Sequence, residues 1–208
     1  MPLTAAPPEE SVLLHNISWE TYERLLEDNV SRATRFAYDE GELEIMVVSA
    51  GHEGPNHALV YIAGIVAEVT GRDFQNYGTT TFRRKDLAKG FEPDCCFYIR
   101  DAPGMRGKKE IDLATDPPPE LIIEVDITRS SLNRFRIFAA VGVEEIWRYQ
   151  AERVQFYRLE GESYREIKES VALSPMTASQ ATLFVEQRER ETWSAWLNSI
   201  RDWVRARL

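Results

Sequence analysis

The sequence predicts an α/β fold in which helices flank a mixed β-sheet. Segments with helical spacing of apolar residues are separated by runs of several short strand-like segments, which is not the regular alternation of a doubly wound fold. The segment Leu121–Asp126 is almost wholly apolar before its acids, and this is typical of a central strand covered on both faces. A chain of 208 residues is long enough for one domain with a sizeable core.

Apolar periodicity and turn residues predict the elements one by one. In the first half of the chain we expect a disordered tail over 1–12, a helix over 19–29, strands over 34–38 and 42–48, and a helix from 54 to about 70. Strands over 73–77, 79–84 and 94–100 follow, and then a polar loop over 101–119 and a strand over 121–126. The rest is expected to form a helix from Ser130 or Ser131 to about 141, strands over 145–149, 153–159 and 164–167, and helices over 178–206 broken near 191. Ser18 is a suitable N-cap for the first helix, and Asp39-Glu40-Gly41 is a hairpin signal. Residues 13–208 are expected to form one domain with a C-terminal helical extension.

Composition excludes some classes of protein. The formal net charge of −9 is not that of a protein that coats nucleic acid. The segment 83–109 nevertheless holds eight basic and four acidic residues, and it is either a solvated hairpin and loop or a track for a phosphate backbone. No apolar run is long enough to span a membrane and no secretory signal is recognisable, so we expect a cytoplasmic protein with no membrane partner. The adjacent Cys95 and Cys96 are expected to be reduced and to point to opposite faces of a strand.

Two acidic strand motifs lie thirty residues apart. The first is Glu92-Pro93-Asp94 before an apolar run, and the second is Glu124-Val125-Asp126 after one. Ionised carboxylates beside a core are costly unless a cation compensates them. Mg²⁺ is a suitable partner, because it binds a few carboxylate oxygens together with water and phosphate. If Asp94 and Glu124 converge on one ion, the pair predicts metal-assisted phosphodiester chemistry.

These motifs resemble a known group of enzymes. Pro93-Asp94 and Glu124-Val125-Asp126, with a long helix before and another after, resemble the PD-(D/E)xK nuclease superfamily, and more closely its Uma family of bacterial restriction-endonuclease-like proteins, a domain of unknown function. The similarity covers about residues 15–185, and the stretches that carry it are 78–87, 90–94, 119–125 and 138–149. It implies a restriction-endonuclease-like fold, an endonuclease activity on DNA, and Asp94 and Glu124 as ligands of Mg²⁺ or Mn²⁺.

The chain departs from the superfamily pattern at the third motif position. Asp126 stands where the pattern has lysine, and members of the family commonly carry the lysine in the following helix, which here corresponds to Arg134. Arginine keeps the positive charge and can hold a phosphate oxygen, but it stays protonated and cannot transfer a proton. Lys85 is an alternative substitute. Asp126 either adds a third ligand oxygen or turns its carboxylate to the opposite face.

Other polar residues have two interpretations each. His52-Glu53-Gly54-Pro55-Asn56-His57 is not a zinc-protease HExxH motif, because its histidines are five apart and Gly54-Pro55 is expected to prevent a helix through them. Glu53 and His57 lie where the long helix is expected to begin; His57 either forms a hydrogen bond at the helix start or positions substrate or water. Glu92 is either a flanking acid or an outer-sphere metal ligand.

The C-terminal helix is compatible with two interpretations of the oligomeric state. Trp193, Trp196, Leu197, Ile200, Trp203 and Val204 follow helical spacing, and they either pack on the protein's own core or form a partner interface. A homodimer is expected, with this face or the helix bearing Trp19 and Tyr22 at its interface. The function predicted is metal-dependent DNA cleavage by Asp94, Glu124 and Arg134; the alternatives are a catalytically silent nucleic-acid-binding or regulatory module and an oligomeric scaffold.

Overall fold

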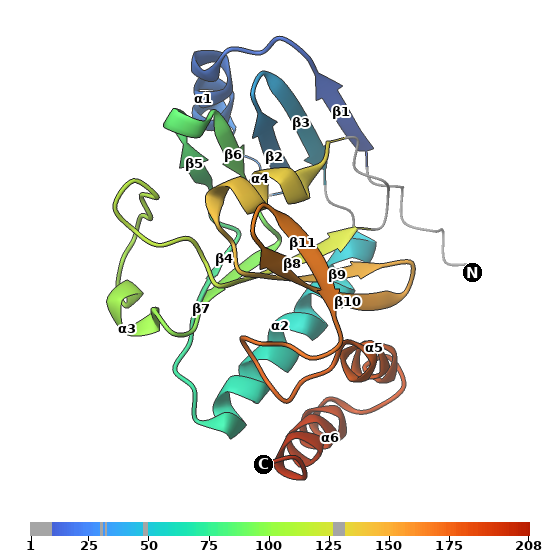
Figure 1. Cartoon of the computed structure of the whole chain (residues 1–208). Coiled ribbons are helices and arrows are strands. Elements are labelled where there is room, and N and C mark those ends of the chain that lie inside the picture. Colours follow the sequence, from blue (N-terminus) through green and yellow to red (C-terminus); the bar gives the residue numbers. More distant parts are fainter. Residues whose placement is uncertain (1–9, 30, 32, 48–49, 127–131) are drawn as a thin grey trace, which may run out of the picture.

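The computed structural model describes residues 10–29, 31, 33–47, 50–126 and 132–208. Within them the chain forms two β-sheets with helices around them, as Figure 1 shows. The smaller sheet comes from the N-terminal half of the chain, and the larger one begins after the long helix α2. The predicted α/β class with a mixed sheet is confirmed, but a second sheet was not predicted.

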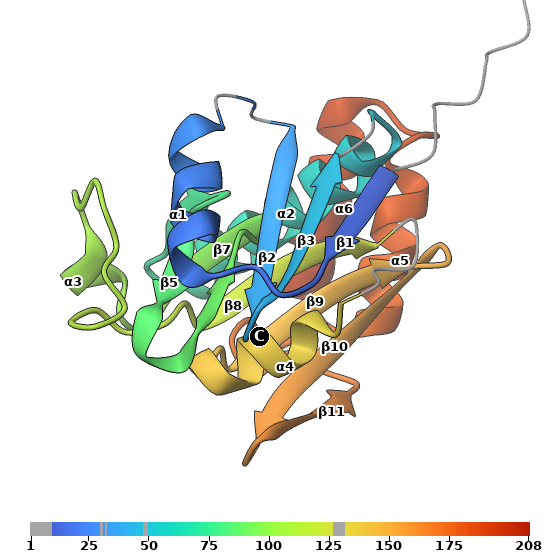
Figure 2. The ribbon, with the colours of Figure 1, turned by 90° about the horizontal axis from the view of Figure 1, so that it is seen from above.

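The smaller sheet is antiparallel and has the order β1-β3-β2-β6-β5. Its strands are β1 (Glu10–Leu14), β2 (Thr34–Asp39), β3 (Glu42–Val47), β5 (Phe82–Arg84) and β6 (Lys89–Phe91). In Figure 2, β1, β3 and β2 lie side by side. Helix α1 (Trp19–Asp28) starts at Ser18, whose hydroxyl accepts from the Thr21 amide, and it buries Trp19 and Tyr22 against this sheet. The predicted helix and hairpin are therefore confirmed.

The larger sheet is mixed and has the order β11-β10-β9-β8-β7-β4. Its strands are β4 (Gln75–Gly78), β7 (Cys95–Tyr98), β8 (Leu121–Asp126), β9 (Glu145–Gln150), β10 (Arg153–Glu160) and β11 (Ser163–Ile167). Strand β8 pairs antiparallel with β7 and parallel with β9, and five of its six residues are buried. The predicted central strand is confirmed, since apolar side chains of β8 meet a core on each face.

Helices cover both faces of the larger sheet. The helices α2 (Ala50–Thr70), α5 (Ala178–Gln187) and α6 (Trp193–Arg205) share one core with it, while α4 (Arg134–Val141) packs on the opposite face and also contacts the smaller sheet (Figure 1). Cys95 belongs to the first core and Cys96 to the second, and both thiols are free, as predicted. Helix α4 thereby lies between the two sheets. No helix in the described ranges has the length and apolarity that crossing a membrane requires.

Three predictions about these elements were wrong, and one is not tested. Residues 10–12 are not a disordered tail, because β1 gains backbone hydrogen bonds from the edge of β3. Strand β6 was not predicted, and its three residues are too few for a visible alternation. The loop over 101–119 contains a short helix, α3 (Ala102–Met105), with Pro103 in its first turn, where proline is tolerated. The predicted start of α4 at Ser130 or Ser131 lies outside the described residues.

The long helix begins at Ala50 rather than Gly54, and it includes Pro55. Pro55 is the sixth residue of this helix, so it lies just beyond the first amides that lack an intrahelical partner and removes only one hydrogen bond of the second turn. The helix therefore does run through His52 and His57, contrary to our expectation. It still makes no zinc-protease motif, because residues five apart point roughly 140° from each other around a helix.

The tryptophan-bearing α6 packs on the protein's own core. Trp196, Ile200 and Val204 have no exposed surface, and the Trp196 indole donates a hydrogen bond to the Phe184 carbonyl at 2.8 Å. Trp193 lies at the margin, 47% exposed, with its ring edge-on to Tyr61. Trp19 and Tyr22 of α1 are also buried in their own core. These aromatic side chains are explained by internal packing.

We predict that Trp196→Ala lowers the free energy of unfolding by about 3–5 kcal/mol, since it leaves a large cavity in the core. Trp193→Ala, the matched control in the same helix, is expected to cost less than about 1 kcal/mol because its ring is half exposed. Urea unfolding followed by tryptophan fluorescence and circular dichroism measures both values. Equal losses in the two variants would contradict the packing described.

Candidate active site

Asp94 and Glu124 face each other at the ends of neighbouring strands. The antiparallel register pairs Cys95 with Ile123 and Cys96 with Ile122, so the next position outward places Asp94 opposite Glu124. Side chains at opposed positions of two strands lie on the same face of a sheet. The structure therefore brings the two predicted metal ligands together, and both side chains are buried.

One oxygen of Asp94 is held by two donors. Asp94 Oδ2 lies 2.9 Å from His52 Nε2 and accepts from the Val125 amide at 2.7 Å. The His52 ring is 1% exposed and reaches the site from the first turn of α2. Because two donors from different elements fix one carboxylate oxygen, the orientation of the Asp94 side chain is set by the fold.

Glu124 pairs with Arg134, the first residue of α4. Arg134 Nη1 donates to Glu124 Oε2 at 2.6 Å, and Nη2 donates to the Glu92 carbonyl at 2.9 Å. Burial raises the pKa of Glu124 to about 8; the Arg134 charge acts in the opposite direction, and the nearby Asp94 charge adds to the increase. The carboxylate of Glu124 is thus costly to hold ionised, and its neighbouring cation offsets only part of that cost.

Each of the two acids keeps one oxygen that is buried and unused. Asp94 Oδ1 and Glu124 Oε1 have no hydrogen-bond partner within the described residues. Buried polar atoms are normally satisfied, so an unsatisfied pair needs an explanation. A divalent cation bound by these two oxygens would supply it, and hard oxygen donors are the ligands that Mg²⁺ and Mn²⁺ favour. The donor set therefore fits the metal that the motif predicts, although the described residues contain no cluster of three or more ligating side chains.

Two other buried carboxylates in the larger sheet provide an internal comparison. Glu120 accepts from the amides of Arg100 at 3.2 Å and Asp101 at 2.8 Å, and also from the Ile99 amide. Both oxygens of Glu145 accept hydrogen bonds, Oε1 from side chains and Oε2 from backbone amides. Glu120 immediately precedes β8 and Glu145 begins β9, at the opposite end of the strands from Glu124. Only at the Asp94–Glu124 end are carboxylate oxygens left over among these four acids, which marks that end as the candidate site.

A cleft of about 410 Å³ opens beside Glu124. We refer to it as the Glu124 cleft; it is lined by Met46, Glu124, Val125, Asp126, Leu132, Asn133, Arg134, Phe135, Phe138, Arg148 and Gln150. Met46 comes from the smaller sheet, and the other elements are β8, β9 and the start of α4. Asp126 lies on the Glu124 side of the strand, where Arg148 and Gln150 both donate to its Oδ2.

Glu92 connects the two sheets near this site. Its carboxylate accepts from the Phe36 amide at 3.0 Å and from the Thr81 hydroxyl at 2.6 Å. Its carbonyl, rather than its carboxylate, contacts Arg134. Glu92 therefore positions the backbone before Asp94 by hydrogen bonds that involve both carboxylate oxygens.

Three predicted accessory residues are not brought into contact with the acidic pair. Glu53 and His57 lie on the exposed side of α2 and pair with each other at 3.4 Å. Lys85 is 67% exposed in its side chain and lies 4.0 Å from Glu20 of α1. None of the three has a contact with Asp94 or Glu124 within the described residues.

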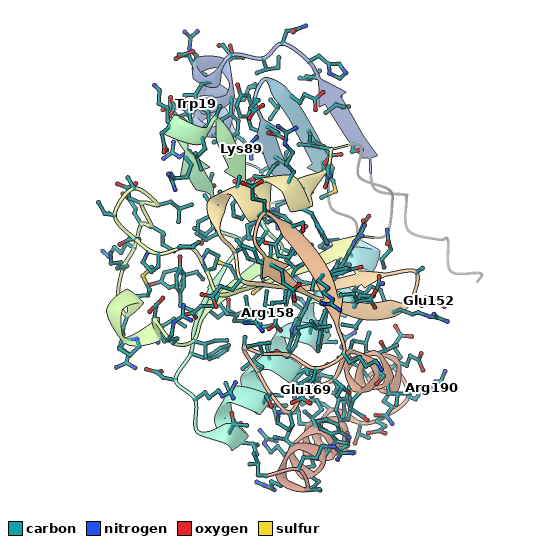
Figure 3. All side chains as sticks on the ribbon, in the orientation of Figure 1. Trp19, Lys89, Glu152, Arg158, Glu169 and Arg190 are labelled. Atoms are coloured by element: carbon teal, nitrogen blue, oxygen red, sulfur yellow. The ribbon has the colours of Figure 1, made fainter. Side chains whose placement is uncertain are left out.

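The basic segment 83–109 is largely neutralised within the chain. Its ion pairs join Arg83 to Glu23, Arg84 to Asp86, Lys85 to Glu20, Lys89 to Asp39, Arg100 to Glu144, Arg106 to Asp73 and Lys108 to Asp116. Lys89, labelled in Figure 3, is buried in the smaller sheet and cannot meet a phosphate backbone. The solvated-loop interpretation of this segment fits these contacts better than a continuous phosphate track.

Two residues of the site were missed from the sequence. His52 lies in a helical turn that Gly54-Pro55 hides from pattern reading, and only the docking of α2 brings it to Asp94. Arg148 lies on β9, where the alternation of side chains indicates which face of the sheet a residue occupies but not which residue it contacts. Arg148 is far from Glu124 along the sequence, but the two positions pair directly across neighbouring strands.

Comparisons with known proteins agree with this geometry. The model of the Uma2 family, described as "Putative restriction endonuclease", matches residues 19–186. This chain belongs to that family. Among solved structures, a protein of Anabaena variabilis described as a putative nuclease belonging to DUF820 matches with a TM-score of 0.50 and 15% identity, covering 88% of this chain and 97% of that chain. At this identity the match shows a shared fold alone. No curated protein matches this chain.

The resemblance of the sequence to the Uma family is thereby confirmed. So is the restriction-endonuclease-like fold, in which a mixed sheet is flanked by helices. The Uma2 match spans both acidic motifs, Arg134 and the aromatic segment through Tyr149. Membership of this family supports a nuclease at that general level.

We predict that Arg134→Ala lowers the free energy of unfolding by about 3–5 kcal/mol, because it leaves Glu124 buried without its cation. Adding Glu124→Gln to that variant is expected to restore a large part of the loss, since a neutral amide needs no counter-ion. The control Arg201→Ala breaks an exposed pair with Glu68 and should cost less than about 1 kcal/mol. Chemical denaturation of the native protein, the single variants Arg134→Ala and Glu124→Gln, their double variant and the Arg201→Ala control checks this; strictly additive losses for Arg134→Ala and Glu124→Gln would be inconsistent with the pairing.

Proposed function

We propose that this protein is a metal-dependent endonuclease that hydrolyses phosphodiester bonds in DNA. The observation that carries the proposal is the facing pair Asp94 and Glu124, each with one buried oxygen that has no partner among the described residues. Membership of the Uma2 family supports a nuclease, and the fit of two carboxylate oxygens to Mg²⁺ or Mn²⁺ supports the cofactor.

The side chains of the site have different proposed roles. Asp94 and Glu124 would hold the ion, which when bound polarises a phosphate and lowers the pKa of an attacking water. His52 and the Val125 amide fix the second oxygen of Asp94, so that Oδ1 stays aimed at the ion. Arg134 holds Glu124 by one nitrogen and places positive charge beside it, where negative charge develops on the phosphate.

Charge in the site makes substrate binding depend on the cation. Asp94, Glu124 and Asp126 are opposed by Arg134 and Arg148, which leaves one excess negative charge when all are ionised. A phosphate would be repelled by that set, and a divalent cation reverses the sign. The protein is thus expected to bind DNA at this site more tightly with metal than without it.

A catalytically silent nucleic-acid-binding or regulatory module is the second candidate. It is favoured by the 2.6 Å contact between Arg134 and Glu124, since a permanently protonated guanidinium occupies one ligand oxygen and cannot transfer a proton. The net charge of −9 also favours the silent module over a protein that binds and cleaves DNA. Activity and metal binding must therefore be measured separately.

We predict that the protein cleaves DNA in Mg²⁺ or Mn²⁺, and that Asp94→Ala reduces cleavage to the background without metal. The same metals should raise the melting temperature of the native protein and not of Asp94→Ala, since binding to the folded state alone stabilises it. Asp73→Ala, which removes an exposed acid paired with Arg106, is the control and should behave as the native protein does. Metal-dependent stabilisation without cleavage would favour the silent module, and neither effect would reject the metal site.

We predict that Arg134→Lys increases the cleavage rate, because an amine placed near a cation and an acidic pair can exchange a proton and a guanidinium cannot. The control is Arg136→Lys in the same helix, whose side chain is 62% exposed. Initial rates of plasmid nicking give the comparison, and thermal unfolding confirms that each variant is folded. An unchanged rate in both Arg134→Lys and Arg134→Ala would remove Arg134 from the mechanism.

A homodimer is part of this proposal, because a cut through both strands needs two sites or one site used twice. The tryptophan residues of α6 and α1 do not identify its interface, since Trp196 and Trp19 are packed inside their own protein. Target sequence and preference between DNA and RNA are separate properties on which the acidic pair has no bearing.

A further inference from the structure

Strand β9 brings a second arginine to the acidic site. The parallel pairing of β8 with β9 places Arg148 beside Glu124 and Gln150 beside Asp126. Alternate residues of a strand share a face, so all four side chains belong to the same side of the sheet. All four also line the Glu124 cleft.

The Arg148 side chain contacts Asp126 and Phe135, and Gln150 holds the same Asp126 oxygen. Arg148 Nη2 donates to Asp126 Oδ2, and Gln150 donates to the same oxygen at 3.2 Å. Its guanidinium carbon lies 5.5 Å from the centre of the Phe135 ring, over the ring face. A carboxylate below and an aromatic face beside it fix the plane of a guanidinium while leaving its charge in place.

The two arginines of the cleft differ in how available they are. Arg134 uses Nη1 on Glu124 and Nη2 on the Glu92 carbonyl, and only 10% of its side chain is exposed. Arg148 has 26% of its side chain exposed. Arg134 is therefore mainly the counter-ion of Glu124, and Arg148 is the cation that projects toward an incoming ligand.

The rest of the cleft is suited to an anion of moderate size. A volume of about 410 Å³ is within the range of small-ligand sites, so a phosphodiester group with its sugars can enter. The start of α4, Asn133 to Phe135, forms part of the wall, and the N-terminus of a helix favours negative charge. The helix start and Arg148 thus contribute positive potential to the same space.

We propose that Arg148 is a phosphate-binding residue for the DNA backbone, positioned by Asp126. In this arrangement β9 supplies the cation that β8 lacks, since Asp126 stands where the superfamily pattern has lysine, and its carboxylate holds Arg148 instead. Asp126 is then a positioning residue and not a third metal ligand. The inference rests on the proposed function only in taking DNA as the polyanion.

The test is DNA binding, measured without cleavage. Fluorescence anisotropy of a labelled DNA duplex is recorded at several salt concentrations, once with Ca²⁺ in place of Mg²⁺ and once with EDTA. Arg148→Gln is expected to weaken binding about tenfold at low salt and to reduce the slope of log K against log salt by about 1, as loss of one phosphate contact does. Arg148→Lys should keep the slope, because the charge remains.

Two further variants sharpen the result. Asp126→Asn should also weaken binding, because Arg148 loses its anchor; removal of a carboxylate that merely lay near DNA would strengthen it instead. Arg165→Gln is the matched control, since Arg165 is an exposed arginine of β11 that pairs with Glu160 and does not line the cleft. Thermal unfolding establishes that each variant is folded.

The outcomes separate this inference from the proposed function. An unchanged affinity and salt slope in Arg148→Gln, or no binding of DNA by the native protein in either buffer, would overturn it. Binding at least as tight in Asp126→Asn would overturn the positioning role. Arg148-dependent binding by a protein that fails to cleave DNA in Mg²⁺ or Mn²⁺ would support Arg148 as a phosphate contact while rejecting the endonuclease.

Discussion

The antiparallel register between β7 and β8 is the constraint on which the site depends. It places Asp94 opposite Glu124 at the end of a sheet whose two faces are otherwise filled by apolar side chains. Removal of water raises the pKa of Glu124, so the surroundings have to bring donors and cations to the acids. They come from three directions, with His52 from α2, the Val125 amide from β8 itself and Arg134 from α4.

The smaller sheet and α4 complete this environment. Helix α4 lies between the sheets, where Phe138 packs edge-on against Phe91 of β6 at 5.0 Å. That contact fixes the direction in which the helix begins, and therefore where Arg134 reaches. Glu92 ties the backbone before Asp94 to β2 through the Phe36 amide, and Met46 of β3 forms one wall of the Glu124 cleft. The second sheet is thus a structural support of the acidic pair as well as an addition to the fold.

The acidic site contains carboxylate oxygens that lower the stability of the fold and can serve as ligands of a cation. At the other end of the larger sheet, Glu120 and Glu145 are buried with both oxygens satisfied. Within the part of the chain that the structure describes, Asp94 and Glu124 each retain an unsatisfied oxygen, which costs free energy that a bound cation could recover. The contrast within one sheet is a physical argument for function that does not depend on sequence similarity.

The sequence by itself determined most helices and strands, the central position of β8 and the two acids. Leu121–Ile123 is apolar on both faces, Ser18 begins α1 and Gly142 ends α4 by local chemistry, and Asp39-Glu40-Gly41 turns a hairpin; each depends on neighbours within a few residues. The Pro93-Asp94 and Glu124 motifs identified the family for the same reason, since the acids stand at fixed places beside apolar runs. Tertiary structure alone decided which residues contact these acids. His52, Arg148 and the second sheet reach the site through packing of distant segments, and Glu53, His57 and Lys85 are directed elsewhere by helix phase and by exposed ion pairs. Periodicity fixes which side of an element a residue occupies, but docking of one element on another sets its partner.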